Sequence, residues 1–344
     1  MSTPRAPAYR KAGVDLHAGD EVVRRLKPLA AATRVPGVES TLGSFGGFFS
    51  FPEVGGEDLL IASIDGVGTK MKVARLTGCW EGAGYDIVSH CVDDILVHGA
   101  LPLFFLDYIG SAHLDVEIVE ALGRGMSRAC REAGCALLGG ETAEMPGVYV
   151  EGEVDLVGCI VGAVKRSALL PGGRVRAGDV LIGLASAGLH TNGYSLARRV
   201  LLDQGPGADA PLGAGPTTIG EALTAPHRMY LPAVRPYLGR AELHGFAHIT
   251  GGGIPGNLVR ILPEGVRAQI SRGSWHVPPL FREIQRRGRV ADEEMHEVFN
   301  MGIAWILIVD PAVADTWTKE LQPAWGAVTI GRLVPGEQGV VLAE

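Results

Sequence analysis

The sequence has few of the features that mark several common protein classes. Its 344 residues include only five cysteines and no C-x-x-C pair, so neither a disulfide framework nor a zinc site of familiar spacing is indicated. The longest strongly apolar stretch, residues 301–309, is too short for a membrane span, which needs about 20 residues. Residues 1–15 have no apolar core and are not expected to be a signal peptide. We therefore expect a reduced, cytoplasmic protein with no membrane partner.

Positive charge is also scarce. The net charge is −7, and the only basic cluster, residues 282–289, is expected to be a solvated helix end. Binding to a nucleic-acid backbone requires clustered lysine and arginine, so we expect no nucleic-acid partner. The sequence also lacks the G-x-S-x-G and H-E-x-x-H motifs, so covalent catalysis by a side chain is not indicated.

The length favours two domains, because single cores rarely exceed about 250–300 residues. Residues 165–179 are basic and rich in turn formers, and we place the boundary there, between domains at 1–168 and 169–344. Alternating strand and helix patterns predict an α/β fold of mixed α+β character, with mixed sheets flanked by helices in both domains. The predicted strands are 40–51, 57–65, 101–110, 154–164, 179–185, the start of 246–262, and the start of 135–147, which runs into a glycine loop; the predicted helices are 21–33, 84–100, 115–134 and 196–202.

Four glycine-containing loops follow predicted strands. They occupy residues 65–70, 139–147, 186–195 and 250–256. Glycine lets backbone N–H groups approach an anion, and helix N-termini favour negative charge. The first loop, DGVGTK, does not have P-loop spacing, because its threonine precedes its lysine and its glycines are nearly adjacent. Together the four loops indicate a phosphate-rich ligand.

Acidic residues accompany these loops. Asp65 and Glu141 each stand where a predicted strand gives way to a glycine loop. Helix 84–100 is predicted to be amphipathic, with a polar face that carries Asp86, His90, Asp94 and His98. Carboxylates would repel a phosphate unless a cation lay between them, and Mg²⁺ takes carboxylate and phosphate oxygens together. Lys70 would then counter the phosphate charge. The alternative is that Asp65 caps a turn and Asp94 is a solvated helix residue.

Two histidines lie in or before the later loops. His190 and Asn192 stand between Gly188 and Gly193, where a histidine is well placed for proton transfer or phosphate contact. His248 precedes the TGGG segment and is a weaker candidate. The alternative for both is a surface or satisfied core histidine.

The sequence resembles one enzyme family over residues 8–340. The segments AYRKAGVDLHAGD, DGVGTK, LPLFFLDY, LLGGETAEMPG, LHTNGYSL and AHITGGG occur in the order found in phosphoribosylformylglycinamidine cyclo-ligases. The resemblance implies a homodimer of two-domain chains, with N-terminal sheets that pair across the dimer and ATP bound nearby. It implies conversion of formylglycinamidine ribonucleotide to aminoimidazole ribonucleotide in de novo purine biosynthesis. In that reaction ATP phosphorylates the formamide oxygen, the amidine nitrogen closes the ring, and ADP and phosphate are released.

The resemblance also implies roles for individual residues. Asp65, Asp94 and Glu141 match positions expected to hold Mg²⁺. The positions expected to bind ATP are Lys27, Gly66, Gly68, Thr69, Lys70, Asp94, Gly139, Gly140, Glu141 and Thr142. The positions expected to meet the substrate are Gly188, His190, Asn192, Gly193, His248, Thr250, Gly251 and Gly252. Asp65, Lys70 and His190 are the expected catalytic residues. Phosphoryl transfer requires the protein mainly to position the reactants and to neutralise the charge of the phosphates.

The chain departs from the family pattern at three positions. Asp93 stands where asparagine is common, which leaves open whether Asp93 or Asp94 reaches the metal. Leu189 replaces a proline, and His227 stands where a small hydroxyl residue is frequent.

Two other classes remain as alternatives. One is a sibling ATP-dependent phosphotransferase of the same superfamily. A selenophosphate synthetase is disfavoured because STLGSFGGFF has no cysteine, a maturation dehydratase because no cysteine follows Cys159, and a thiamin-monophosphate kinase because YRKAGVD is present. The other is a non-catalytic nucleotide-binding protein, which would be expected to have lost some of the acids.

Overall fold

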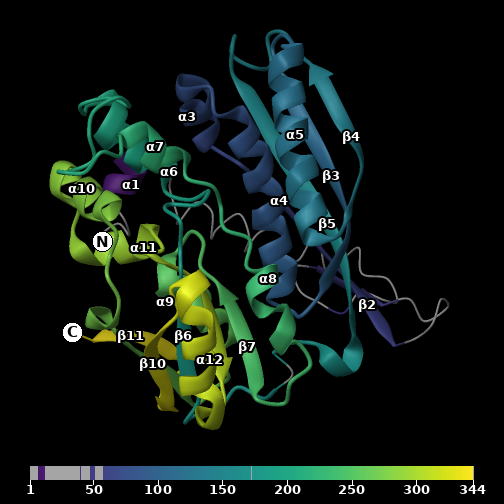
Figure 1. Ribbon diagram of the computed structural model, residues 1–344, viewed down its shortest axis with the longest axis vertical. Coiled ribbons are helices and arrows are strands. Elements are labelled where there is room, and N and C mark those ends of the chain that lie inside the picture. Colours follow the sequence, from purple (N-terminus) through teal and green to yellow (C-terminus); the bar gives the residue numbers. More distant parts are fainter. Residues whose placement is uncertain (1–6, 12–38, 40–46, 51–56, 172, 344) are drawn as a thin grey trace, which may run out of the picture.

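The computed structural model describes residues 7–11, 39, 47–50, 57–171 and 173–343, which form two α/β halves side by side (Figure 1). Lys27, the predicted helix 21–33 and most of the strand predicted at 40–51 fall outside these residues. Within them, the expectation of mixed sheets flanked by helices is confirmed in both halves. None of the described helices is long and apolar enough to cross a membrane.

The N-terminal half is built on a five-stranded sheet with the order β1-β2-β5-β3-β4. Only the β3–β4 pair is parallel. Helices α4 and α5 lie together against one face of this sheet, as Figure 1 shows. The strands are β1 Gly47–Ser50, β2 Asp58–Gly66, β3 Leu101–Ser111, β4 Ala136–Glu144 and β5 Val154–Lys165; the helices are α1 Pro7–Lys11, α3 Lys70–Thr77, α4 Trp80–Leu96 and α5 Val116–Ala133.

Glycines in β5 let α4 lie close to the sheet. The side chains of β5 alternate between buried and half-buried, and Gly158 and Gly162 fall on the buried face. A Cβ added at Gly158 would stand 2.2 Å from the ring of Phe105, and one at Gly162 would stand 2.5 Å from Ile95 of α4. Any side chain at these two positions would push the helix outward, away from the residues that it contributes to the interior.

The C-terminal half is built on a six-stranded sheet with the order β11-β8-β10-β6-β9-β7. The apolar run predicted to be too short for a membrane forms β9, which is buried along its whole length. A strand buried on both faces needs such an uninterrupted apolar pattern, and α12 and α9 pack over this sheet. The strands are β6 Val180–Ala185, β7 Leu243–His248, β8 Val266–Ser271, β9 Ile303–Val309, β10 Val328–Pro335 and β11 Gly339–Ala343; the helices are α6 Tyr194–Arg198, α7 Ile219–Thr224, α8 Leu231–Val234, α9 Gly253–Leu258, α10 Pro279–Gly288, α11 Asp292–Val298 and α12 Pro311–Trp325.

Two expectations about local structure were wrong. Helix α4 begins at Trp80 rather than residue 84, and its polar face is buried, because α4 stands between the N-terminal sheet and the C-terminal half (Figure 1). Residues 139–144 form the second half of β4 rather than a loop, because they continue in parallel register with β3. Glu141 is therefore a residue of an edge strand and does not stand at the start of a loop.

The two halves share one apolar core cluster. Ile95 of α4, Tyr230 before α8 and Trp305 of β9 all belong to it. The link between the sheets runs from Lys165 to Val180, around the boundary that we place between residues 168 and 169. Because the core is continuous across this junction, polar groups on α4 are held at fixed positions relative to the C-terminal loops.

Candidate functional site

The polar face of α4 is the centre of the candidate site. Asp86 and Asp93 are 0% exposed, His90 is 3% exposed and Asp94 is 6% exposed. The expectation that Asp94 could be a solvated helix residue is wrong. A helix that buries four ionisable side chains must supply each with a partner, since an unpaired buried charge is very costly. Those partners come from β2 and from the C-terminal half.

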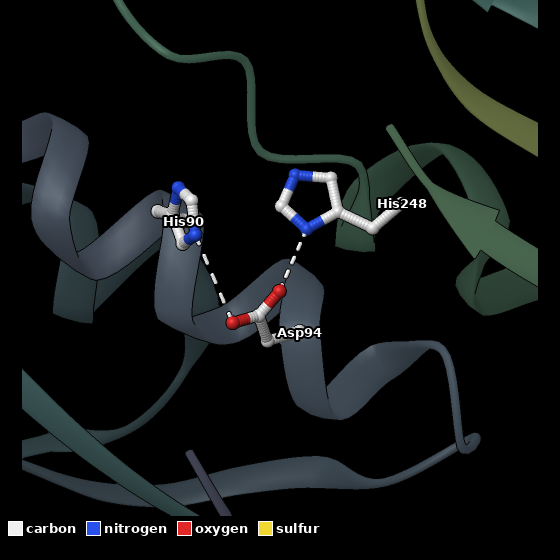
Figure 2. A group of neighbouring side chains, drawn as sticks. All are labelled: His90, Asp94 and His248. Carbon is white, nitrogen blue, oxygen red and sulfur yellow. Dashed lines mark hydrogen bonds and ion pairs between the residues drawn. The ribbon is translucent and has the colours of Figure 1, made fainter. Parts of the chain in front are cut away.

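A chain of acid–histidine contacts joins β2, α4 and β7. Oδ2 of Asp65 lies 2.7 Å from Nε2 of His90, which lies 3.7 Å from Oδ2 of Asp94. Oδ1 of Asp94 lies 2.9 Å from Nδ1 of His248. Figure 2 shows His90 and His248 turned toward the Asp94 carboxylate from opposite sides. The hydroxyl of Ser63 donates a further hydrogen bond to Oδ2 of Asp94, at 3.0 Å.

The contact between Asp65 and His90 shifts their two pKa values in opposite directions. Burial alone would raise the pKa of Asp65, but the neighbouring His90 outweighs it and holds that pKa below its usual value. Burial would lower the pKa of His90, but Asp65 and Asp94 raise it to about 9. His90 is therefore a cation between carboxylates at neutral pH. Asp65, whose side chain is 45% exposed, is the residue of this acid–histidine group that a ligand in solvent can reach.

Lys70 does not present its ammonium group to a phosphate. It is 2% exposed, and its Nζ lies 2.5 Å from Oδ2 of Asp86 and 2.8 Å from the carbonyl oxygen of Ala225, to which it donates. Nζ also lies 5.6 Å from the centre of the Tyr194 ring, where a cation is favoured. Burial would lower the pKa of Lys70, but Asp86 outweighs it and raises that pKa. The predicted phosphate contact is thus corrected to a buried ion pair between the two halves.

Gly68 and Thr69, the two residues before Lys70, remain at least partly exposed. Gly68 is exposed and has φ +64°, a conformation in which glycine is unstrained. The hydroxyl of Thr69 lies 3.1 Å from that of Ser195, at the start of α6. Gly66 donates its N–H to Oδ1 of Asp65, so Asp65 does cap its own turn. The turn at the end of β2 is therefore shaped by Asp65 and leaves Gly68 accessible.

The loop between β6 and α6 holds His190 in an unusual conformation. His190 has φ +61°, which is uncommon for a residue with a side chain, and it is 1% exposed. Its Nε2 accepts the N–H of Ala187 at 3.2 Å, and its ring lies 4.2 Å from that of His227. Burial lowers the pKa of His190 well below its usual value, so the imidazole is neutral. Such strain is typical of positions fixed for a function.

The second C-terminal loop, residues 250–253, lies next to the first. A Cβ added at Gly251 would stand 3.3 Å from Oδ1 of Asn192, so these two loops are in contact. At Gly253, which has φ +60°, a Cβ would stand 1.9 Å from the carbonyl oxygen of His296, so only glycine fits. Asn257, which the sequence did not single out, donates its Nδ2 to the carbonyl oxygens of residues 250, 251 and 253 and holds the loop closed.

Glu141 is not brought to the other predicted metal ligands within one chain. Asp65, Gly158, Asp107 and Gly140 stand in one row across β2, β5, β3 and β4. With neighbouring strands about 4.8 Å apart, Gly140 and the adjacent Glu141 lie about 14 Å from β2. The strand segment 139–142 is exposed along the sheet edge. A single chain therefore assembles Asp65 with Asp94 and leaves Glu141 apart.

The sequence did not identify several residues that complete the site. Thr191 lies between two histidines, 2.5 Å from Nδ1 of His90 and 3.5 Å from Nδ1 of His227. Asp86 accepts the N–H of His227 and pairs with Lys70. The recurrence of polar residues every fourth position of α4 was the available signal, but the pattern alone cannot tell a solvent face from a face covered by another domain.

Comparison with known families agrees with the two-domain architecture. Models of the N-terminal and C-terminal domains described as "AIR synthase related protein" match residues 48–164 and 176–344. The fold and these matches show that the chain belongs to the AIR synthase related proteins.

Individual relatives narrow this class. The chain is 46% identical to the phosphoribosylformylglycinamidine cyclo-ligase of Sorangium cellulosum, over 97% of this chain and 98% of that protein. It is 44% identical to the protein of the same name from Paraburkholderia phymatum, over 99% and 98%. It is also 42% identical to the trifunctional purine biosynthetic protein adenosine-3 of Gallus gallus, over 98% of this chain and 34% of that protein. The chain belongs to the phosphoribosylformylglycinamidine cyclo-ligase family.

Solved structures share the fold at low sequence identity. One is described as AaThiL complexed with AMPPCP and TMP; it has a TM-score of 0.63 and 16% identity, over 93% of this chain and 92% of that one. Another is HypE of E. coli, with a TM-score of 0.60 and 18% identity, over 94% of both chains. These likenesses show the architecture alone.

Proposed function

We propose that this chain is an ATP-dependent phosphoribosylformylglycinamidine cyclo-ligase of de novo purine biosynthesis, acting in the cytoplasm. The observation that carries the proposal is 46% identity to an enzyme of that name over nearly the whole of both chains. ATP phosphorylates the formamide oxygen of formylglycinamidine ribonucleotide, and the amidine nitrogen then attacks the activated carbon. Phosphate leaves, and the products are aminoimidazole ribonucleotide, ADP and phosphate. Phosphorylation is needed because an amide oxygen is a poor leaving group.

The solvent-facing carboxylate of Asp65 could hold a magnesium ion, which Asp94 would reach only by giving up its hydrogen bond to Ser63 or its contact with His248. Asp65 offers a half-exposed carboxylate, and Asp94 lies behind it with His90 between them. Carboxylate oxygens are the ligands that Mg²⁺ prefers. Asp93 is turned away, because its Oδ1 accepts the N–H of Tyr230 at 2.8 Å, so Asp94 is the adjacent acid that faces Asp65. Bound Mg²⁺ would offset the charge of the ATP phosphates; His90 would hold the two carboxylates in place.

His190 is our candidate for contact with the ribonucleotide substrate. Its imidazole is neutral and its Nδ1 has no hydrogen-bond partner among the described residues, so it can accept a proton. Gly188, Asn192 and Gly193 shape the same loop. Thr250, Gly251 and Gly252 form the adjoining loop, where backbone N–H groups can approach a phosphate, and His248 anchors its start through Asp94.

We further propose that the enzyme is a homodimer joined through the N-terminal sheets. Ile64, Cys159 and Leu106 stand in one row on the face of the sheet opposite α4. Ile64 is 68% exposed and Leu106 is 36% exposed, and a sheet face of this kind favours burial against a second copy. Gly139, Gly140, Glu141 and Thr142 would then complete the ATP site across the dimer, since they lie too far from Asp65 in one chain.

Two experiments test these proposals. ADP release by the purified protein is measured in a coupled assay with and without formylglycinamidine ribonucleotide. Strict dependence on that substrate supports the cyclo-ligase, whereas ADP release that does not depend on it would contradict the cyclo-ligase. Binding of ATP with no turnover would indicate a non-catalytic protein. For the dimer, light scattering should show two chains in the wild type and one in Ile64→Asp, with Leu76→Asp, exposed on α3, as the control. A monomeric wild type would exclude the dimer.

A further inference from the structure

Three fully buried side chains converge at the junction of the two halves. Asp93 comes from α4, His227 from the segment between α7 and α8, and His248 from the end of β7, and all three are 0% exposed. One ligand atom from each residue lies within 4.8 Å of the other two. No role in the proposed reaction requires Asp93 or His227.

Each of these side chains has an unpartnered polar atom. Among the described residues, Oδ2 of Asp93, Nε2 of His227 and Nε2 of His248 have no hydrogen-bond partner. Nε2 of His227 and Oδ2 of Asp93 are 3.6 Å apart, which is longer than a hydrogen bond. Buried polar atoms are nearly always satisfied, so unpartnered atoms on three side chains that meet at one place point to a ligand that these side chains share.

The remaining polar atoms of the same side chains are already engaged in a way that orients them. Nδ1 of His248 lies 2.9 Å from Asp94, and Figure 2 shows the other ring nitrogen on the far side of the ring from that carboxylate. Nδ1 of His227 faces the hydroxyl of Thr191, and Oδ1 of Asp93 accepts the N–H of Tyr230. A histidine held at one nitrogen by a carboxylate, with the other free, is typical of metal ligands.

We infer that Asp93, His227 and His248 form a binding site for a divalent transition metal of the zinc class. Two imidazoles and one carboxylate suit zinc, iron or nickel better than magnesium, which prefers oxygen ligands alone. In a tetrahedral zinc site, ligand atoms lie about 3.3 Å apart, and the 3.6 Å between His227 and Asp93 is close to this.

A neighbouring group that shares His248 is a poorer site. His90, Asp94 and His248 also bring potential ligand atoms together, and Figure 2 shows this group. There, however, Nε2 of His90 is held by Asp65, and both oxygens of Asp94 accept hydrogen bonds, from Ser63 and His248. A metal at that place would have to break these contacts, whereas one beside Asp93 breaks none.

The inferred metal would join α4 to two segments of the C-terminal half. It would therefore hold the two halves together next to His190, whose ring lies 4.2 Å from that of His227. The inference stands apart from the proposed function, because it depends on neither ATP nor the ribonucleotide. Asp93 and His227 are also two of the three positions at which this chain departs from the family pattern, so asparagine at 93 and a small hydroxyl residue such as serine at 227 are suitable replacements.

The test is metal binding by the full-length chain. After removal of metals with a chelator, Zn²⁺ is titrated by calorimetry, and Co²⁺ is titrated by visible absorption, which reports ligand type. We expect one high-affinity equivalent per chain and a higher melting temperature with Zn²⁺. Asp93→Asn and His227→Ser should each weaken binding at least about 100-fold, because even the loss of outer-shell partners costs 10–100-fold. His113→Gln, at an exposed histidine, is the control and should bind as the wild type does.

Three outcomes would overturn the inference. They are the absence of a high-affinity equivalent, binding that survives both Asp93→Asn and His227→Ser, and displacement of Zn²⁺ by a moderate excess of Mg²⁺. Asp93→Asn retains the Oδ1 that accepts from Tyr230, so this variant is expected to fold; circular dichroism of both variants checks that weak binding is not unfolding.

Discussion

Replacing Lys70 with methionine tests whether this lysine contacts a phosphate or holds the two halves together. The side chains of Lys70 and Asp86 are 3% and 0% exposed, with Nζ and Oδ2 2.5 Å apart. Removing one partner of a buried pair leaves the other charge uncompensated, at a cost of about 3–5 kcal/mol. Methionine retains much of the volume of lysine, so the electrostatic loss should dominate. We expect Lys70→Met to lower the free energy of unfolding by about 3–5 kcal/mol.

A double-mutant cycle separates the ion pair from the rest of the effect. Asp86→Asn removes the charge but retains Oδ1, which accepts the N–H of His227 at 2.6 Å. The variant with both substitutions has no buried charge to compensate and should be less destabilised than the two single effects added together. For contacting residues we expect a coupling energy of about 0.5–3 kcal/mol. Urea denaturation followed by tryptophan fluorescence and circular dichroism measures all four proteins.

The opposite pattern would refute this reasoning. If Lys70→Met unfolds at the same urea concentration as the wild type but shows a much higher KM for ATP, Lys70 contacts phosphate and the buried pair is not its main role. Loss of stability with no coupling to Asp86 would also contradict the structure, because the carboxylate of Asp86 lies 2.5 Å from the Lys70 ammonium group and is the acidic partner of Lys70 among the described residues.

Three further predictions concern the candidate site. Asp65→Asn should lower kcat by at least about 10²-fold, by loss of charge stabilisation; near-wild-type turnover at limiting Mg²⁺ would remove Asp65 from the metal site. His190→Ala should lower kcat/KM severely while His113→Gln does not, and an unchanged kcat/KM would return His190 to a structural role. The third concerns pH: the His90 pKa is opposed by burial but raised to about 9 by Asp65 and Asp94. Because the His90 pKa is higher in the folded protein than in the unfolded chain, protonated His90 stabilises the folded state. This stabilisation is fully present below about pH 6.5 and is lost as the pH rises through 9. At 1.36 kcal/mol per pH unit, the loss amounts to about 3 kcal/mol. Urea denaturation in a chelating buffer should show this decline in the wild type and not in His90→Asn; parallel curves would contradict it.

Much of the local structure could be predicted from the sequence because its causes are local. The helix predicted at 115–134 is observed at Val116–Ala133, with the carboxylate of Asp115 accepting N–H groups at its start and Gly134 in the left-handed conformation at its end. The strand predicted at 154–164 is observed at Val154–Lys165. The conformation of residues 139–144 was mispredicted, because glycine content indicates a loop, whereas pairing with β3 stabilises a strand there.

By itself, the sequence determined the fold class, the family and the position of Asp65 at the end of a buried strand. These follow from periodicity, from turn chemistry and from motifs whose residues are close together in the chain. The tertiary structure decided which charges meet. It turned the polar face of α4 inward, paired Lys70 with Asp86 across 16 positions of the chain, separated Glu141 from Asp65, and brought Asp93 to His227 and His248. Such contacts depend on how the two halves pack, and no local pattern encodes that packing.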